Sequence, residues 1–348
     1  MQPNKKLIIA FSLLLLVTCQ FPSLPGFATP TPLSTFTSTL TSTAPASPTS
    51  SQTATLTVTT SPTETLTPTI TPTSAPLARR VLILSIDGLR PDAISLAPMP
   101  NLMNLMQSSA YTLSAQTVYP SVTLIAHSSM LTGLCPSKHG VDWNDYLPEK
   151  GYAIGTDLFD IAHAAGFQTD MFVGKKKLIQ ISEPSSLDQF VFINDRDSVI
   201  IDRLLAGFPQ DFGVLFIHFP LVDDMGHNYG WLSTQQLNVA FRADEALERL
   251  LVELDARNLR GETLIIITAD HGGHDTTHGS SMPEDMTIPW IASGPGIQPK
   301  QLTTTVHTMD TAATAAFALG LDIPAEWDGV PVYEGFGLPI EKQSVQCP

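Results

Sequence analysis

Hydrophobic and polar residues follow two periodicities along the chain after about residue 80. Short apolar runs, such as 81–86, 214–219 and 263–268, are typical of buried strands. A longer stretch with apolar residues three or four positions apart, 235–258, predicts an amphipathic helix. The complete prediction comprises strands at 81–86, 169–173, 190–193, 214–219, 263–268 and 289–292, and helices at 100–108, 124–131, 157–165, 199–205, 235–258 and 310–319. This alternation predicts an α/β fold with a mostly parallel sheet and helices on both of its faces.

The first 77 residues have a different composition from the rest of the chain. Lys5 and Lys6 precede the apolar run 7–17, which is too short for an ordinary membrane span and is typical of a secretory signal. Residues 28–77 are mainly Thr, Ser and Pro, and they cannot bury enough apolar surface to offset their conformational entropy. We therefore expect a signal peptide at 1–27, a disordered stalk at 28–77 and one folded domain at 78–348.

The cysteines limit the type of scaffold and suggest a route to the membrane. The segment that ends at Cys19 resembles a bacterial lipoprotein cleavage site, although Thr18 stands where Gly, Ala or Ser is usual. Lipidation of Cys19, an ordinary cleaved signal and an uncleaved N-terminal anchor therefore stay open, and each predicts an exported protein outside the cell or at its surface. Only Cys135 and Cys347 would then remain for a disulfide, so a disulfide-rich scaffold is excluded.

The formal net charge of −15 bears on the class of partner. Contacts with nucleic-acid phosphates require clustered Lys and Arg, so we expect no specific binding of nucleic acid. A small phosphate-bearing substrate is still compatible with this charge, because bound metal ions reverse the local field.

Acidic and histidine side chains follow three of the predicted strands. The carboxyl ends of parallel strands lie at one edge of a sheet, where open α/β sheets hold their ligands. Carboxylates and imidazoles without thiolates suit zinc best, with manganese or iron as alternatives, and two ions are a common device for displacement at phosphorus. Any one of these residues alone could be a helix cap or a turn residue, but three such strand ends favour a metal site. The residues are Asp87 after 81–86, Asp223 and His227 after 214–219 and a short loop, and Asp270 and His271 after 263–268.

Four motifs carry a resemblance to a known superfamily. They are V-L-I-L-S-I-D-G-L-R at 81–90, S-V-T-L-I-A-H-S-S-M-L-T-G-L-C-P-S-K-H-G-V at 121–141, D-D-M-G-H at 223–227 and T-A-D-H-G-G-H at 268–274. Their order and spacing resemble the alkaline phosphatase superfamily and, within it, the type I phosphodiesterase/nucleotide pyrophosphatase family. The resemblance covers roughly residues 80–335 and implies a three-layer α/β/α sandwich with a mostly parallel central sheet.

The resemblance also implies a role for each matching residue. Thr123, nine residues before Thr132 of the T-G pair, matches the family's nucleophile, which is also a metal ligand. Asn144, twenty-one residues after Thr123, matches the asparagine that donates to a phosphate oxygen. One ion would be held by Asp87, Thr123, Asp270 and His271, and the other by Asp223, His227 and a third ligand.

The third ligand of the second ion is where the chain departs from the family pattern. Nucleotide pyrophosphatases take this ligand from a His-Gly pair near the C-terminus, but residues 326–331 contain no histidine here. His278, which precedes a glycine, is the best replacement and is similar to the arrangement in phosphoethanolamine transferases of the same superfamily. His307, His274 and a non-protein ligand are the alternatives.

Other polar residues near the motifs receive structural interpretations from the sequence. Asp224 could orient a neighbouring ligand. The sequence favours core or capping roles for His127, His139 and His218, and a solvated turn rather than a phosphate contact for Lys175–Lys177.

Three aromatic residues and one cysteine-containing motif do little to narrow the predicted function. Trp143, Tyr146 and Trp231 could stack on a nucleotide base, but packing explains them equally well. Residues 135–138, C-P-S-K, lack one residue of the formylglycine motif of sulfatases, and no G-x-S-x-G elbow of a serine hydrolase occurs.

The sequence therefore predicts an exported hydrolase with two divalent cations, zinc first among them. Its substrate would be a small phosphate ester with a phosphodiester or pyrophosphate bond, and a phosphothreonine intermediate would form on Thr123. A phosphomonoesterase and a phospho-head-group transferase are the alternatives within the superfamily. A non-catalytic, surface-anchored binding module is the alternative of another class.

Overall fold

The computed structural model describes residues 75–340 and 342–348. The predicted signal peptide, Cys19 and all but the last three residues of the predicted stalk lie outside the described residues. Within the described part, no helix has the length and apolar character needed to cross a membrane.

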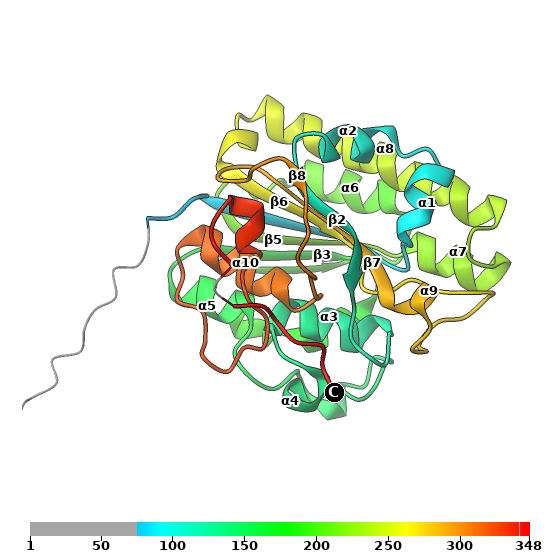
Figure 1. Cartoon of the computed structure of the whole chain (residues 1–348), viewed down its shortest axis with the longest axis horizontal. Helices are drawn as coiled ribbons and strands as arrows, with labels where there is room; N and C mark the ends of the chain where they lie inside the picture. Colours follow the sequence, from blue (N-terminus) through cyan, green and yellow to red (C-terminus); the bar gives the residue numbers. More distant parts are fainter. Residues whose placement is uncertain (1–74, 341) are drawn as a thin grey trace, which may run out of the picture. The chain divides into compact units, whose positions relative to one another are not determined.

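A single eight-stranded sheet lies at the centre of the described fold (Figure 1). Its strand order is β4-β3-β5-β1-β6-β7-β2-β8, and β7 alone runs against the direction of the others. The strands are β1 (Arg80–Ile86), β2 (Ala110–Gln116), β3 (Gln168–Val173), β4 (Gln189–Phe192), β5 (Phe212–Phe219), β6 (Thr263–Thr268), β7 (Thr287–Ser293) and β8 (Lys300–Gln301). The predicted α/β class with a mostly parallel sheet is confirmed.

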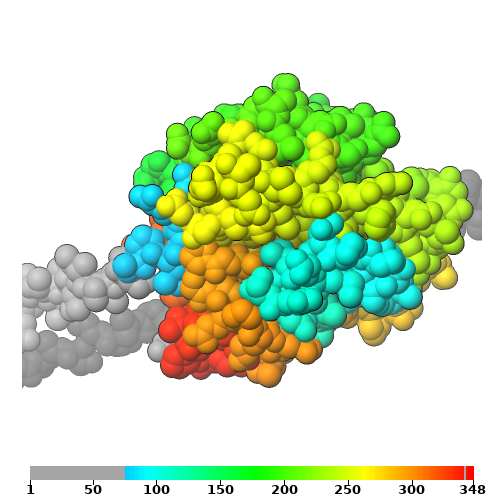
Figure 2. Space-filling view, turned by 90° about the horizontal axis from the view of Figure 1, so that it is seen from above, coloured from blue at the N-terminus to red at the C-terminus, as the bar shows by residue number. Residues whose placement is uncertain are grey.

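The helices form two layers, one on each face of this sheet (Figure 1). In Figure 2, α8 in yellow lies between the α1–α2 segment in cyan and α6 in green. The first layer contains α1 (Pro91–Leu96), α2 (Pro100–Met106), α6 (Asp197–Ala206), α7 (Leu221–Tyr229) and α8 (Thr234–Ala256). The second contains α3 (Thr123–Thr132), α4 (Pro136–His139), α5 (Leu158–Ala164) and α10 (Asp310–Leu319), while the short α9 (Pro283–Met286) precedes β7.

The register of the central strands explains why the candidate ligands lie at one edge. β1 pairs in parallel with β5 on one side and with β6 on the other, so Ser85 lies opposite both His218 and Thr268. Asp87 follows directly after β1, and the segments after β5 and β6 leave the sheet at the same edge. Because every side chain of 81–86 is buried, a shift of this register would cost extensive apolar burial.

Helix α3 is fixed in the core along its whole length. All ten of its residues are buried, and the hydroxyls of Ser128 and Thr132 donate to the carbonyls one turn earlier. The helix ends at Gly133, whose φ of 67° favours glycine and whose Cβ would lie 2.7 Å from the Trp327 ring. The first turn, which begins at Thr123, therefore has a fixed position beside the sheet edge.

Two stretches differ from the pattern-based prediction. The segment that carries Asp223 and His227 is not a short loop; it is helix α7, which begins two residues after β5. Its sequence includes Gly226 and asparagine, which are weak helix formers, and its packing against α8 compensates for that weakness. Strand β2 was missed because its mixed residues are only partly buried, so its place is set by pairing with β7.

A disulfide links Cys135, just after α3, to Cys347 near the C-terminus. The two cysteines are 212 positions apart, so the bond closes a loop that includes most of the sheet. A cross-link of this kind restricts the unfolded chain and thereby stabilises the folded state.

We expect the double variant Cys135→Ser/Cys347→Ser to lose about 2–4 kcal/mol of unfolding free energy, because its unfolded chain is no longer cross-linked. Denaturant unfolding of the variant and of the wild type, each with and without reductant, measures the difference. Reductant should lower the stability of the wild type alone. Equal unfolding midpoints for the variant and the oxidised wild type would contradict the stabilising role.

Candidate metal centre

Asp87 is fully buried at the end of β1 and is surrounded by cationic and imidazole groups. Its Oδ2 lies 2.8 Å from His218 Nε2 and 2.7 Å from Lys175 Nζ, and its Oδ1 lies 3.3 Å from His271 Nε2. Burial alone would raise the pKa of Asp87, but Lys175 and the two histidines hold it well below its usual value. Asp87 is therefore a carboxylate.

The first ligand set is Asp87, Asp270 and His271, whose ligand atoms lie within 4.8 Å of one another. His271 Nε2 is 3.3 Å from Asp270 Oδ2, and its Nδ1 donates to the Gly272 carbonyl at 2.8 Å. This hydrogen bond directs the Nε2 atom toward the carboxylates. Although burial opposes the charge, Asp270 and Asp87 raise the pKa of His271 to about 9.

The second ligand set is Asp223, His227 and His278. Asp223 Oδ1 lies 3.4 Å from the Nε2 atom of each histidine, and the two Nε2 atoms are 3.1 Å apart. Each histidine donates its Nδ1 hydrogen to a backbone carbonyl, of Thr276 at 3.0 Å and of Ser121 at 2.8 Å, so both Nε2 atoms face Asp223. Three candidate ligand atoms on two segments thus lie close together, and Asp223 and His278 also form a group with His271 whose ligand atoms lie within 4.8 Å of one another.

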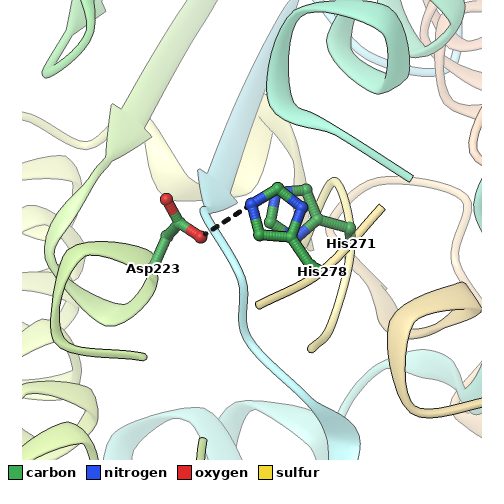
Figure 3. Close-up of side chains that lie close together, drawn as sticks. All are labelled: Asp223, His271 and His278. Atoms are coloured by element: carbon green, nitrogen blue, oxygen red, sulfur yellow. Dashed lines mark ion pairs between the residues drawn. The ribbon is translucent and has the colours of Figure 1, made fainter. Parts of the chain in front are cut away.

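The two ligand sets are adjacent. Figure 3 shows the rings of His271 and His278 stacked beside Asp223, and the centroids of the two rings are 3.7 Å apart. Burial and the neighbouring charge of His271 lower the pKa of His278 to about 4, so His278 is neutral near pH 7 and its Nε2 can bind a cation.

Several buried atoms of this centre have no hydrogen-bond partner within the described residues. Buried polar atoms normally have one, so their concentration here points to an interaction with another species. Carboxylate oxygens and an imidazole nitrogen are suitable ligands for zinc. The atoms without a hydrogen bond, which meet charged neighbours only at ion-pair distances of 3.3–3.4 Å, are Asp87 Oδ1, Asp223 Oδ1, Asp270 Oδ2 and His271 Nε2.

Thr123 and Asn144 lie beside this centre at the N-terminus of α3. Thr123 is the first residue of the helix and is buried. Asn144 Oδ1 accepts hydrogen bonds from Leu124 N and from Lys177 Nζ, each at 2.9 Å. Both contacts use the amide oxygen, which leaves the NH₂ group of Asn144 as the donor for an anion at this helix end.

His218 and His127, for which the sequence favours core or capping roles, contact the candidate ligands. His218 accepts from Gly174 N at 3.3 Å, so its other nitrogen donates to Asp87. His127 Nδ1 lies 2.8 Å from the Thr123 carbonyl and 3.3 Å from Asp270 Oδ2. His218 is one residue before the end of β5, and β5 lies next to β1. The place of His218 near the end of a strand was the available sequence signal, but the order of the strands in the sheet is needed to interpret it.

The interpretation of 175–177 as a solvated turn is wrong for Lys175 and Lys177, whereas Lys176 is exposed. Lys175 bridges the two ligand sets, with Nζ 2.5 Å from Asp223 Oδ2 and 2.7 Å from Asp87 Oδ2, and its side chain is only 17% exposed. Lys177 contacts Asn144. Both lysines follow β3, whose pairing with β5 brings them to the same edge of the sheet.

The rival histidines for the second set are directed elsewhere. His274 Nδ1 lies 2.7 Å from Asp285 Oδ1, and His307 Nδ1 lies 2.7 Å from Ser344 Oγ. His139 bonds with Ser129 Oγ at 3.0 Å in the core. Trp231 is buried and donates to a backbone carbonyl, so it is not an exposed stacking surface for a base.

The sequence matches one family of known proteins, both in a family model and in an individual relative. A sequence model of the family "Type I phosphodiesterase / nucleotide pyrophosphatase" matches residues 81–286. Human ectonucleotide pyrophosphatase/phosphodiesterase family member 5 is 26% identical over 220 residues, which cover 57% of this chain and 45% of that protein. The chain thus spans less than half the length of this relative.

Two solved structures share the fold. The inactive Thr-to-Ala variant of the murine family member 5, in complex with AMP, has a TM-score of 0.63 at 15% identity and covers 75% of this chain and 99% of its own. A mutant of alkaline phosphatase PafA has a TM-score of 0.65 at 12% identity with the same coverage. The alkaline-phosphatase-like sandwich is confirmed, and the match over more than half of the chain shows that this protein belongs to the type I phosphodiesterase/nucleotide pyrophosphatase family.

Proposed function

We propose that this protein is an exported, metal-dependent hydrolase that cleaves a phosphodiester or pyrophosphate bond in a small phosphate ester. The observation that carries this proposal is the convergence of two candidate ligand sets, which share His271 as a neighbour and contain buried atoms without a hydrogen bond, beside the helix end that begins at Thr123. The family of the chain supports the reaction class.

In this proposal two zinc ions are the cofactors. Asp87, Asp270 and His271, together with the Thr123 hydroxyl, hold one ion, and Asp223, His227 and His278 hold the other. When bound, such ions supply Lewis-acid stabilisation of phosphoryl charge and lower the pKa of a coordinated hydroxyl.

Thr123 is the nucleophile in the proposed reaction. Its Oγ forms a bond to phosphorus while the opposite P–O ester bond breaks, and the leaving oxygen takes the electron pair and a proton. A water oxygen then attacks the phosphothreonine, which releases phosphate or a phosphate monoester and restores the hydroxyl. The Asn144 amide and the N-terminal dipole of α3 stabilise the equatorial oxygens during both steps.

Export is supported by the Cys135–Cys347 disulfide, because disulfides persist mainly in oxidising compartments. We propose that residues 1–27 direct export and that residues 28–77 form a stalk for the catalytic domain at 78–348. Lipidated Cys19 or an uncleaved N-terminal segment would provide the membrane tether.

A phosphomonoesterase is the second candidate, and the two lysines favour it. A monoester presents three unsubstituted oxygens and up to two negative charges, whereas a diester presents two such oxygens and one charge. Lys177, which is held on Asn144 Oδ1 beside Thr123, and Lys175, between the ligand sets, add positive charge where the phosphoryl group would lie. This arrangement suits the more highly charged substrate.

We expect Thr123→Ala to lower the hydrolysis of bis-p-nitrophenyl phosphate and p-nitrophenyl phosphate at least 10³-fold, since the nucleophile is removed. Thr123→Ser keeps a hydroxyl and should retain a measurable part of the activity. Steady-state kinetics of the zinc-loaded proteins give the rates, and acid quenching gives the covalent phosphoenzyme. Undiminished turnover by Thr123→Ala would exclude the covalent mechanism, and a wild type inactive on both esters would favour a binding module.

We expect His278→Ala to bind about one zinc ion per chain where the wild type binds about two, because the second ligand set loses a ligand. His274→Ala and His307→Ala are matched controls, since neither ring faces the centre, and both should keep the wild-type stoichiometry. Metal analysis after dialysis measures the zinc content. If His278→Ala keeps both ions, the assignment of His278 is wrong.

We expect Lys177→Ala to lower monoester turnover relative to diester turnover by about 10–100-fold, which corresponds to the loss of a charge-assisted hydrogen bond. Lys176→Ala is the control, because Lys176 Nζ lies over the Tyr146 ring at 4.3 Å rather than on Asn144. The two rates are compared for each variant. An unchanged ratio in Lys177→Ala would remove the argument for a monoesterase.

A further inference from the structure

Trp231 contacts all three segments that carry the candidate ligands. It follows α7, is 8% exposed, and donates its indole Nε1 hydrogen to the Gly88 carbonyl at 2.9 Å. Gly88 comes directly after Asp87. The backbone N of Trp231 donates to the Asp275 carbonyl at 2.7 Å, so the same residue also binds the segment between His271 and His278.

Two glycines allow the indole to approach these segments closely. A Cβ on Gly226 would lie 2.8 Å from the indole ring, and one on Gly273 would lie 2.2 Å from it. Gly226 is next to His227, and Gly273 lies two residues after His271. Any larger residue at either position would displace the ring or the ligand-bearing backbone.

The indole also packs against two of the ligand rings. The His227 ring meets it edge-on, with a centroid distance of 5.3 Å and an interplanar angle of 86°. The His278 ring lies 5.8 Å away at 68°. These contacts hold the Nε2 atoms of His227 and His278 close together, 3.1 Å apart.

We propose that Trp231 is a positioning residue that fixes the second ligand set relative to the first and thereby sets the affinity for the second ion. This inference rests on the proposed two-ion site. One rigid ring system joins the end of β1, helix α7 and the loop that carries His278. Without it, the positions of His227 and His278 would no longer be fixed relative to Asp87. Supporting groups of this kind typically change metal affinity 10–100-fold.

Zinc titration of the full-length protein against a competing chromophoric chelator tests the proposal. Trp231→Phe should weaken binding of the second ion about 10–100-fold and leave the affinity for the first ion unchanged. Excess zinc should then restore kcat in this variant, which the loss of a catalytic group would not allow.

Trp327→Phe is the matched control. Trp327 is also buried, donates its Nε1 hydrogen to the Thr156 carbonyl at 2.8 Å, and packs against Gly133, at the far end of α3 from Thr123. This variant should lose thermal stability but bind both ions as the wild type does. If Trp231→Phe and Trp327→Phe lose zinc affinity equally, Trp231 contributes only general packing and the inference is overturned.

Gly226→Ala tests the same contact without removal of the tryptophan. Alanine favours a helix, so α7 should remain folded while the added methyl group displaces the indole. Second-ion affinity should again fall at least tenfold; wild-type affinity in both Gly226→Ala and Trp231→Phe overturns the positioning role. A wild type that binds fewer than two ions instead refutes the two-ion site on which the inference rests.

Discussion

The central constraint on this structure is the meeting of three buried carboxylates, those of Asp87, Asp223 and Asp270, at one edge of the sheet. Buried charges of like sign repel strongly where water cannot screen them. The fold places Lys175 between two of these carboxylates and His271 between Asp87 and Asp270. These cationic neighbours offset only part of the negative charge, and that imbalance favours the binding of a cation at this edge.

The sheet creates this constraint through its order and register. β1 lies between β5 and β6, all three strands run in the same direction, and their side chains are almost all buried on both faces. The sheet therefore sets the positions of Asp87, directly after β1, and of Asp270 and His271, two and three residues after β6. The hydrogen bonds of His218 to Asp87 and of Gly88 N to Asp270 Oδ1 at 3.2 Å add a second layer of support behind them.

Sequence reasoning identified what strong local patterns encode. The apolar runs of β1, β5 and β6 predicted the strands, and the residues that follow them predicted the ligand candidates. It missed α7, whose helix depends on packing against α8, and it misjudged Lys175, whose partners are 88 and 48 positions away along the chain. Trp231 was equally ambiguous, because its contacts with Gly88, Gly226 and Gly273 come from three separate segments. For Lys175, and for the contacts of Trp231 with Gly88 and Gly273, the deciding information is a long-range contact, and for α7 it is the packing against the next helix. No local periodicity contains either kind of information.

The charge balance also indicates what the centre can bind. Without metal, the three carboxylates face two cationic groups, Lys175 and His271, whose pKa of about 9 keeps it protonated near pH 7. Two divalent ions would add four positive charges and release the proton of His271, because a ligating imidazole must be neutral. With Lys175 still charged, the bound ions would make the centre net positive, before the Thr123 hydroxyl loses its proton. A centre of that charge attracts phosphate esters although the whole chain is acidic, so the charge of −15 and a phosphate-bearing substrate are compatible.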